Sequence, residues 1–523
     1  MSAASAARRP PVILLLPAIL VGAGMLVPLA YLVVRAASVD LDVALQLLLR
    51  ERTLTLFLNT MKLTVCVLAL ATAIALPLAW LVVRSDLRGR RVLAVLSVMP
   101  LAVPGYVMAY SLIGLSGYYG PLNQFFGVAL PRLQGLPGAT LALSLYTFPY
   151  IFLNLRASLL GMDPSLEETA RSLSRTRFQA FREVTLPHLV PALMSGWLVV
   201  GLYTLGDFGV IALMRYEVFS FAIYNQYVGA FDRFYAAWLS LMLMSLTVSF
   251  LVVEGLAMRK RRFARVGTGV QRRATPVPLG RLRPLAKAFL VLVYGASLGL
   301  PLSIIAFWMG RGTTAVDWAT LWATALRTAG AALPGATLAV LLALPLVLLT
   351  VRYRSTASWF VERLAYFGYA VPPLSFALAM VFFSLGVLPA LYQTLALLVA
   401  AYALSFVALA MGPVRSALLQ TGGRMEEAAR SLGRGPVAAF VQVTLPLVSR
   451  SLLAGGMLVF ILIVKELPIT FLLAPTGYTT LSMNIFSRTS EGMLIETAPY
   501  ALVIILFSSL FAGLVLRYEG RRA

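Results

Sequence analysis

The sequence predicts an all-α membrane protein with about twelve transmembrane helices, arranged as two parallel repeats of six. Three observations predict this fold class. The chain of 523 residues is 60% apolar and only 12% charged, whereas soluble proteins are about 45–50% apolar and about one quarter charged. It contains twelve apolar runs, each long enough to cross a hydrocarbon core about 30 Å thick. Several segments also recur later in the chain at fixed offsets.

The twelve apolar runs must be helices in a bilayer, because lipid cannot satisfy unpaired backbone groups. The first run follows Arg8 and Arg9, as in a signal peptide, but it is long and has no clear cleavage site, so we expect a retained anchor. The predicted spans cover residues 11–34, 57–83, 92–115, 138–160, 192–214, 234–258, 286–309, 330–351, 358–386, 394–414, 451–475 and 497–516.

Basic residues are distributed unevenly between the predicted loops. With a cytoplasmic N-terminus, the inner segments hold 29 lysines and arginines and the outer segments hold eight arginines. This bias follows the positive-inside rule and predicts that both termini are cytoplasmic. The net charge of +23 therefore indicates topology, and nucleic acid is not an expected partner of so apolar a chain.

An internal duplication divides the chain into two halves. ALPLAWLVVR at 75–84 returns as ALPLVLLTVR at 343–352, an offset of 268 residues. Residues 167–187 return at 426–446, an offset of 259, with 13 of 21 positions identical. Because each half has six spans, both halves face the same way, and a pathway between them is expected. The predicted units are a first repeat at 1–258, a basic cytoplasmic linker at 259–285 and a second repeat at 286–523.

Several kinds of chemistry are excluded by composition. Cys66 is the single cysteine and His188 the single histidine, so neither a disulfide framework nor a Cys/His metal cluster is possible. None of the four lysines follows the glycine that a phosphate-binding G-x-x-x-x-G-K-[ST] loop requires. The chain is therefore not predicted to be an enzyme, and ATP hydrolysis would belong to another subunit.

The duplicated segment at 167–187 and 426–446 lies in two inner loops, at about 163–190 and 422–449. Packing alone imposes little on a polar loop, so the likeness favours a protein partner that contacts both copies. A short helix is predicted after Asp163-Pro164-Ser165, with acidic residues in its first turn, as the helix dipole favours. The alternative is a solvated helix on the membrane surface.

This segment resembles the EAA loop of ABC-importer permeases. The second copy has Glu427-Ala428-Ala429, Gly433 and Leu445-Pro446, whereas the first has Thr169 and Ser174 in place of an alanine and the glycine. We therefore expect a less tight turn in the first copy. The resemblance implies that each loop forms a coupling helix that docks into an ATPase subunit. The implied coupling residues are Glu167, Glu168, Ala170, Arg171, Leu173, Glu426, Glu427, Ala429, Arg430, Leu432 and Gly433.

Two carboxylates fall inside predicted spans at repeat-related positions. The offset of 259 aligns Asp207 with Glu466, and a carboxylate inside a membrane costs at least ~2.5 kcal/mol, so such residues usually face a cavity. Acidic groups suit a hard cation, and we expect Asp207 and Glu466 to ligate one transiently. The alternatives are that Glu466 pairs with Lys465 and that Asp207 caps a helix break.

The same offset predicts two further pairs in the outer segments, where they would flank an entrance to the pathway. These are Asn225 with Asn484 and Asp232 with Glu491.

Longer stretches narrow the resemblance. GDFGVIALMRY after the first coupling loop, KELPITFLLAPTGYTTL after the second and AVPGYVMAYSL in span three resemble fused permeases of ferric-iron ABC importers. This resemblance implies the type I importer fold, alternating access, and a place in the inner membrane of a prokaryote. It also implies two copies of a separate ATPase that carries ATP and magnesium, and a separate extracytoplasmic binding protein. No cofactor is expected in this chain.

Three other readings stay open from the sequence. Fused permeases for thiamine or another small solute share the architecture. Secondary transporters of the major facilitator type also duplicate six spans in parallel, and RSDLRGRR at 84–91 partly resembles their inner loop. A channel or membrane scaffold is the third, although neither needs paired coupling segments.

Overall fold

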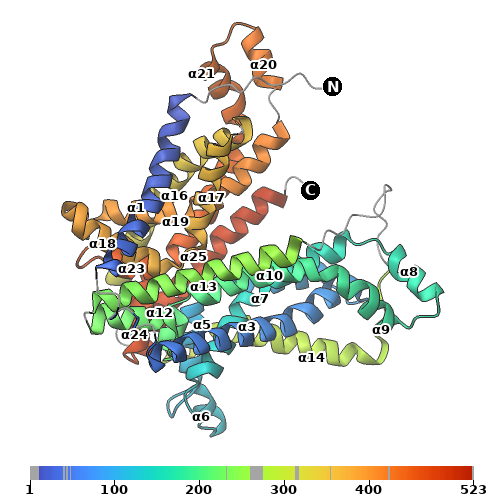
Figure 1. Ribbon diagram of the computed structural model, residues 1–523. Helices are drawn as coiled ribbons and strands as arrows, with labels where there is room; N and C mark the ends of the chain where they lie inside the picture. The colour runs from blue at the N-terminus through green and yellow to red at the C-terminus, as the bar shows by residue number, and fades with distance from the viewer. Residues whose placement is uncertain are drawn as a thin grey trace.

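The structure is a computed structural model that describes residues 11–38, 42, 45–46, 49–230, 232–259, 275–312, 317–353, 355–421 and 424–520. In these ranges it has ten helices long and apolar enough to cross a membrane, or up to twelve if each of two bent pairs is one span. This confirms the predicted fold class (Figure 1). Arg8, Arg9 and most of the predicted basic linker, residues 260–274, lie outside the described residues.

The long helices follow one another in the predicted order. In the first repeat they are α1 (Val12–Ala37), α3 (Glu51–Arg84), α4 (Arg90–Val98) with α5 (Gly105–Leu115), α7 (Gly135–Gly161), α10 (Leu186–Gly206) and α13 (Arg233–Arg259). In the second repeat they are α14 (Arg283–Tyr294) with α15 (Leu300–Arg311), α16 (Trp318–Arg352), α17 (Thr356–Ala370) with α18 (Pro373–Val387), α19 (Leu395–Thr421), α22 (Leu445–Val464) and α25 (Leu494–Gly520).

Short helices occupy equivalent places in the two repeats. The coupling segments form α8 (Ser165–Ser172) with α9 (Arg177–Ala180), and α20 (Arg424–Ser431) with α21 (Pro436–Ala439). A π-helical turn leads from each into the next span, at η2 (Phe181–Thr185) and η7 (Phe440–Thr444). Beyond that span come α11 (Gly209–Leu213) and α12 (Phe219–Tyr224), or α23 (Pro468–Leu473) and α24 (Leu481–Ser490). The first repeat also has α6 (Pro121–Phe126).

Two predicted spans are bent rather than continuous. The segment predicted at 92–115 turns by 90° between Ala102 and Gly105, and that predicted at 358–386 turns by 107° between Ala370 and Pro373. Each break contains a proline, Pro104 or Pro372, in extended backbone immediately before the second helix. Proline lacks the N–H that would continue a helix and disfavours the helical conformation of the residue before it.

Two other predicted spans end early. The spans predicted at 192–214 and 451–475 stop at Gly206 and Val464, and the chain breaks before α11 and α23 begin. In the second repeat, Pro468 follows the break and explains why α22 cannot continue. Asp207 and Glu466 therefore lie at helix ends, and the prediction that each lies well inside a continuous span is wrong.

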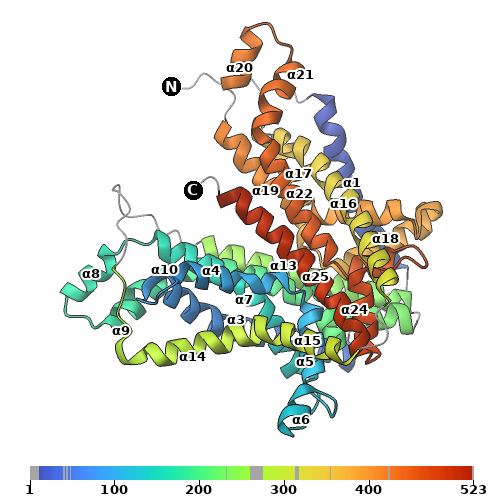
Figure 2. The same ribbon diagram turned by 180° about the vertical axis from the view of Figure 1, so that it is seen from behind.

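The first helix of each repeat packs against the other repeat. Helix α1 contacts α16, α17 and α18 of the second half, while α14 and α15 contact α3 and α5 of the first half. Both exchanges are visible in Figures 1 and 2. The order of helices along the chain and their grouping in space therefore differ at these two helices.

The start of the second repeat is also hydrogen-bonded to the first. The Val277 N–H donates to the Arg84 carbonyl at 2.7 Å, and Ser85 and Val277 form an isolated β-bridge. Asp86 accepts from the Leu279 N–H at 3.1 Å and pairs with Arg283. The Leu279 hydrogen bond, helped by Arg283, lowers the pKa of Asp86 below its usual value. These contacts hold α14 beside α3.

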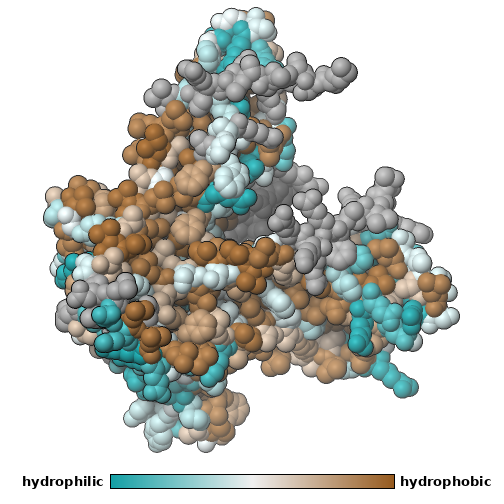
Figure 3. Space-filling view, in the orientation of Figure 1, coloured by the Kyte–Doolittle hydropathy of each residue, from teal (hydrophilic) through white to brown (hydrophobic). Residues whose placement is uncertain are grey.

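The two coupling segments lie at the ends of diverging arms. Helices α8 and α9 end one arm and α20 and α21 end the other, whereas α12, α23 and α24 gather at the opposite end of the molecule (Figures 1 and 2). Figure 3 shows hydrophobic residues along the sides of the molecule and hydrophilic residues gathered at the arm ends. This distribution is expected of a protein whose flanks face lipid.

Candidate functional site: paired coupling helices and a central cavity

Each coupling helix is fixed to its own arm by a buried glutamate. In the first repeat, Glu167 forms an ion pair with Arg84 at 2.6 Å and accepts a hydrogen bond from the Thr185 hydroxyl. Arg84 ends α3 and is only 3% exposed. One carboxylate thus joins α8, α3 and the π-helical turn before α10.

The second repeat builds the same arrangement at the predicted offsets. Glu426 pairs with Arg352 at 2.5 Å and with Arg430 at 2.7 Å, and the Thr444 hydroxyl donates to it at 2.7 Å. Desolvation raises the pKa of Glu426, but the Thr444 hydrogen bond and the two arginine charges outweigh it and hold the pKa below its usual value. We call the two sets the Arg84 brace (Arg84, Glu167, Thr185) and the Arg352 brace (Arg352, Glu426, Thr444).

Large apolar side chains cover the outer face of both coupling segments. Leu173 and Phe178 are 72% and 73% exposed, and their counterparts at offset 259, Leu432 and Val437, are 84% and 74% exposed. Exposed apolar groups at matched positions are typical of an interaction surface. Sequence reasoning missed Phe178 and Val437, although both lie within the aligned repeat.

The predicted coupling residues divide between the two faces. Glu168, Arg171, Leu173, Glu427 and Leu432 are exposed, Ala170 and Ala429 are half-buried, and Glu167, Glu426 and Arg430 make ion pairs or hydrogen bonds within the chain.

The turn after each coupling helix has the same conformation despite the different residues. Ser174 has φ 63° and Gly433 has φ 82°, both left-handed. The expectation of a less tight turn in the first copy is therefore wrong. Serine adopts this conformation at a steric cost of about 1–2 kcal/mol, which glycine avoids.

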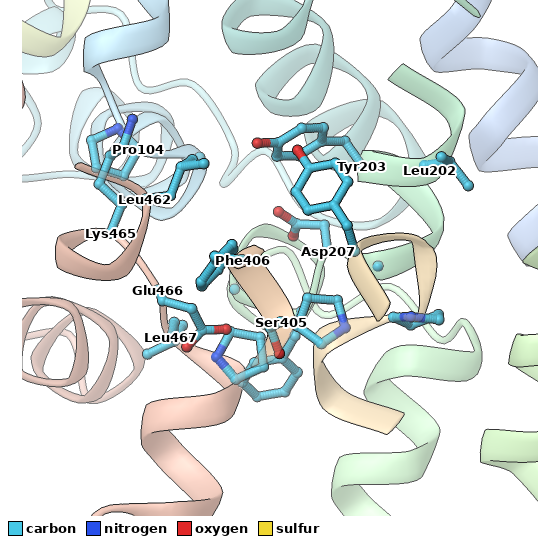
Figure 4. Close-up of a pocket in the computed structure, with 18 of the residues that line it drawn as sticks. Pro104, Leu202, Tyr203, Asp207, Ser405, Phe406, Leu462, Lys465, Glu466 and Leu467 are labelled. Atoms are coloured by element: carbon cyan, nitrogen blue, oxygen red, sulfur yellow. The ribbon is translucent and has the colours of Figure 1, made fainter. Parts of the chain in front are cut away.

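A cavity of about 220 Å³ lies between the two repeats, and both intramembrane carboxylates line it (Figure 4). Its walls come from the bends before α5 and α18, from α7, α10, α19 and α22, and from the breaks after α10 and α22. The offset of 259 residues thus relates two acidic groups that share one cavity.

Asp207 serves the break after α10 as well as the cavity. Its Oδ1 accepts from the Val210 N–H at 2.9 Å, and the Tyr146 hydroxyl donates to Oδ2 at 3.1 Å. Its own carbonyl accepts from the Ser220 hydroxyl at 2.7 Å. The capping alternative therefore describes the geometry of Asp207, but it does not remove the carboxylate from the cavity wall.

Glu466 repeats this arrangement. Its carboxylate accepts from the N–H groups of Ile469 and Thr470 at 3.0 to 3.1 Å, and Ser482 donates to its carbonyl at 2.8 Å. The alternative that Glu466 pairs with Lys465 is not what the hydrogen bonds show, because the Lys465 ammonium donates to the Leu101 carbonyl at 2.9 Å. Lys465 takes the place that Gly206 has in the first repeat.

Five tyrosines also line the cavity, namely Tyr106, Tyr146, Tyr150, Tyr203 and Tyr369. Sequence reasoning assigned most aromatic residues to packing or to lipid contact and missed them. The available signal was a difference between the repeats: at the same offsets the other half mostly has leucine.

Beyond the carboxylates, away from the coupling helices, four aromatic rings meet across the two repeats. The ring centroid of Phe208 lies 4.7 Å from that of Tyr224, 5.2 Å from that of Phe486 and 6.4 Å from that of Phe471. We call this group the aromatic plug (Phe208, Tyr224, Phe471, Phe486). It packs directly behind Asp207, and the chain contributes two rings from each half.

The remaining predicted pathway residues are not brought together as pairs. Asn225 begins a π-helical turn, Asn484 donates to the Thr480 carbonyl, and Asp232 caps α13 through the Tyr235 N–H. None of these three lines the central cavity. Glu491 lines a second cavity of about 630 Å³, together with Arg132, Arg215 and Arg311.

The offset explains why these pairs fail. Thr60 accepts from the Phe219 N–H and Thr328 from the Leu481 N–H, so α12 and α24 are related by 262 residues. Three extra residues before α24 shift the register, and the predicted pairing at 259 does not extend this far.

Among the described residues, no group of three or more histidine, cysteine, aspartate or glutamate side chains is placed to hold a metal ion. Asp207 and Glu466 are a pair, so any cation in the cavity needs further oxygen ligands from other residue types.

Two pseudo-equivalent helical halves, a cavity between them and a peripheral helix braced to each arm define a polytopic membrane transporter driven from its periphery. The family model described as the binding-protein-dependent transport system inner membrane component matches residues 71–262 and 335–521. The chain belongs to this family and is a permease subunit of the inner membrane.

Individual relatives agree with this assignment. The chain is 32% identical to the Fe(3+)-transport system permease protein FbpB 2 of Haemophilus influenzae, over 98% of this chain and 99% of the relative. It is 29% identical to the sulfate transport system permease protein CysT of Salmonella typhimurium, over 36% of this chain and 69% of the relative. It is 33% identical to the molybdenum transport system permease protein ModB of Escherichia coli, over 25% of this chain and 58% of the relative.

Proposed function

We propose that this chain is the membrane permease of an ATP-driven, binding-protein-dependent importer for ferric iron. The observation that carries the proposal is the cavity between the repeats, where Asp207 and Glu466 supply two carboxylates against one ammonium, that of Lys465. Carboxylates suit a hard cation and oppose an oxyanion such as sulfate or molybdate. The near full-length similarity to a relative named for Fe(3+) transport supports the same cargo.

Two copies of a separate ATPase would dock on the coupling helices, one on each arm. The exposed pairs Leu173 with Phe178 and Leu432 with Val437 support this, because they form matched apolar surfaces on α8 with α9 and on the α20–α21 segment. ATP and magnesium would be bound by those subunits and not by this chain. This orientation makes the arm ends cytoplasmic, together with both termini, in accordance with the positive-inside rule.

An extracytoplasmic binding protein would deliver iron at the opposite end, where α12 and α24 lie (Figure 1). Transport then requires alternating access. ATP binding draws the arms together and opens the aromatic plug, and hydrolysis separates the arms and exposes the cavity to the cytoplasm. The wide separation of α8 and α20 in Figure 1 corresponds to the second of these states.

The test is uptake of labelled ferric iron by proteoliposomes that contain this permease, its ATPase and its binding protein, compared with labelled thiamine. We expect ATP-dependent iron uptake and no thiamine uptake. Transport of thiamine without iron would replace the proposed cargo, and uptake without ATPase subunits would overturn the importer class.

A double variant, Asp207→Asn with Glu466→Gln, tests the role of the carboxylates. We expect iron uptake to fall by about tenfold, equivalent to roughly 1.4 kcal/mol of lost stabilisation of the cation. The amide oxygens can still accept the backbone hydrogen bonds of the two caps, so ATPase docking should be unchanged. The matched control is Asp232→Asn, which alters a helix cap outside the cavity. Normal uptake in the double variant would remove the carboxylates from the pathway.

A further inference from the structure

The two walls of the central cavity differ in chemistry although the fold relates them. Tyr146, Tyr150 and Tyr203 of the first repeat correspond to Ser405, Leu409 and Leu462 of the second at offset 259. Tyr106 and Tyr369 likewise correspond to Leu374 and Leu101 at offset 268. Fusion of the halves in one chain allows such divergence, because each position is encoded separately. The phenol groups lie around Asp207, whereas Glu466 has Lys465 beside it in the chain (Figure 4).

Three of these tyrosines form a connected group. The rings of Tyr150 and Tyr203 are stacked, with centroids 5.1 Å apart, and the Tyr203 hydroxyl is hydrogen-bonded to the hydroxyls of Tyr150 and Tyr369. Tyr150, Tyr203 and Tyr369 keep part of their surface exposed in the cavity. Tyr146 is joined to Asp207 by its hydroxyl at 3.1 Å. We call Tyr146, Tyr150, Tyr203 and Tyr369 the phenol wall.

Two further hydroxyl groups in the cavity have no partner. Tyr106 and Ser405 are 5% and 7% exposed, and neither the Tyr106 hydroxyl nor the Ser405 Oγ makes a hydrogen bond. Buried polar groups in proteins are nearly always paired, and an unpaired one requires an explanation. An occupant that offers or orders oxygen atoms in the cavity would satisfy both.

We infer that the phenol wall and Asp207 together form a one-sided ligand site that binds ferric iron in transit, an inference that rests on the proposed function. Ferric iron is a hard cation that prefers oxygen ligands, and phenolate and carboxylate are the anionic oxygen donors on this wall. Three phenolates would balance the charge of Fe(III), which the two carboxylates cannot do. The ammonium of Lys465 makes the opposite wall less favourable to a cation.

Binding at this site is a ligand exchange without redox chemistry. Each phenol that coordinates loses its O–H proton to water and forms one Fe–O bond, while a water or chelator oxygen leaves the iron. The iron remains ferric throughout. Asp207 holds Tyr146 in place through the hydrogen bond at its Oδ2.

The test uses purified full-length permease in nanodiscs, titrated with ferric nitrilotriacetate. We expect a visible phenolate-to-iron charge-transfer band and, on excitation within that band, resonance-enhanced phenolate vibrations. The wild-type protein therefore reports on the proposal without any substitution. Iron binding without these vibrations would overturn the inference.

Variants locate the ligands. Tyr150→Phe with Tyr203→Phe should lose at least tenfold of the band intensity at a fixed iron concentration and slow iron uptake by the complete importer. The matched control is Tyr402→Phe, because Tyr402 is buried in the second repeat, bonded to Thr470 and not part of the cavity wall. Asp207→Asn should weaken binding more than Glu466→Gln, and equal effects would contradict a one-sided site.

The two proposals fail differently. ATP-driven iron uptake that is unchanged in the double tyrosine variant, with no charge-transfer band in the wild type, would overturn the phenol wall and leave the importer intact. A complete importer that carries no iron would overturn the proposed cargo, and with it the ligand site.

Discussion

Single residues decide how force from a partner could reach the membrane. Glu167 and Glu426 are the acids that begin the duplicated segment, yet they make ion pairs with the ends of α3 and α16 within the chain. A coupling helix that was held only by its flanking loops would rotate under load. The Arg84 and Arg352 braces prevent this, because each joins the helix to two membrane helices through charged hydrogen bonds, which are stronger than neutral ones.

Neighbouring glutamates on α8 should therefore respond differently to substitution. Glu167→Ala leaves the buried Arg84 without its partner and should lower stability by roughly 3 kcal/mol, as expected when a buried ion pair is broken from one side. Glu168→Ala, on the exposed face of the same helix, should leave the melting temperature unchanged. Thermal unfolding of the purified chain measures both.

The exposed glutamates have the opposite profile. Replacing Glu168 and Glu427 together should weaken ATPase association or transport without lowering thermal stability. Equal melting temperatures for Glu167→Ala and Glu168→Ala would refute the brace, and unaltered ATPase association and flux in the double variant would refute the exposed face as the docking site.

The Arg352 brace predicts a specific pH dependence. The pKa of Glu426 is lowered in the folded protein, so its contribution to stability is complete above the ordinary glutamate pKa of 4.5 and is lost as the pH falls through the lowered value. The stability difference between wild type and Glu426→Gln should thus be largest near neutral pH and shrink below about pH 4.5. A difference that grows on acidification would contradict the assignment.

At the scale of elements, the breaks after α10 and α22 bring the working parts of the pathway together. Each break ends a long helix beside a carboxylate and starts a short helix that carries part of the aromatic plug, as in Phe471 of α23. Capping of α11 and α23 by Asp207 and Glu466 fixes these carboxylates beside the plug. Movement of either short helix would therefore change the plug and the cavity together.

The aromatic plug should act as the seal on the side away from the coupling helices. Phe208→Ala with Phe486→Ala removes two rings that contact each other across the repeats, and we expect a leak of solute through proteoliposomes that contain the permease alone. The measurement is entry of iron without ATP, with Phe460→Ala as the control, because Phe460 pairs with Phe511 within one repeat. An equally tight double variant would show that the seal lies elsewhere.

Apolar run length was sufficient to predict the number and order of the spans but not their breaks. Hydropathy stays high across Gly206 to Leu213 and across Val464 to Leu473, so a window of 20 residues reads through both interruptions. The prolines at Pro104 and Pro372 were the visible signal for the two bent spans. Alignment of the repeats found both carboxylates of the cavity, because acid residues inside spans are rare.

Contacts between distant segments were beyond the sequence. Arg84 and Glu167 lie 83 positions apart, and Arg84 was counted only as a charge of an inner loop. The tyrosines of the phenol wall come from α5, α7, α10 and α17, and only the fold brings them to one cavity. In the same way, a shift of three residues before α24 was invisible until Thr60 and Thr328 identified equivalent positions.

At the scale of the whole molecule, the two arms are joined at one end and separate at the other (Figures 1 and 2). The exchange of α1 and α14–α15 between repeats keeps the halves together, because each half covers part of the other. The cavity and the plug lie where the arms meet, and the coupling helices lie where they part. Closing the arm ends would therefore move the walls of the cavity against each other.

The distance between the two coupling helices in the assembled importer tests this account most directly. Ser172 and Ser431 are exposed, equivalent positions at offset 259, and spin labels on Ser172→Cys and Ser431→Cys, with Cys66→Ser, report that distance by pulsed electron paramagnetic resonance. The account predicts a long distance without nucleotide and a clearly shorter one when a non-hydrolysable ATP analogue is bound to the ATPase. A distance that does not respond to nucleotide, in a complex that still transports, would contradict it.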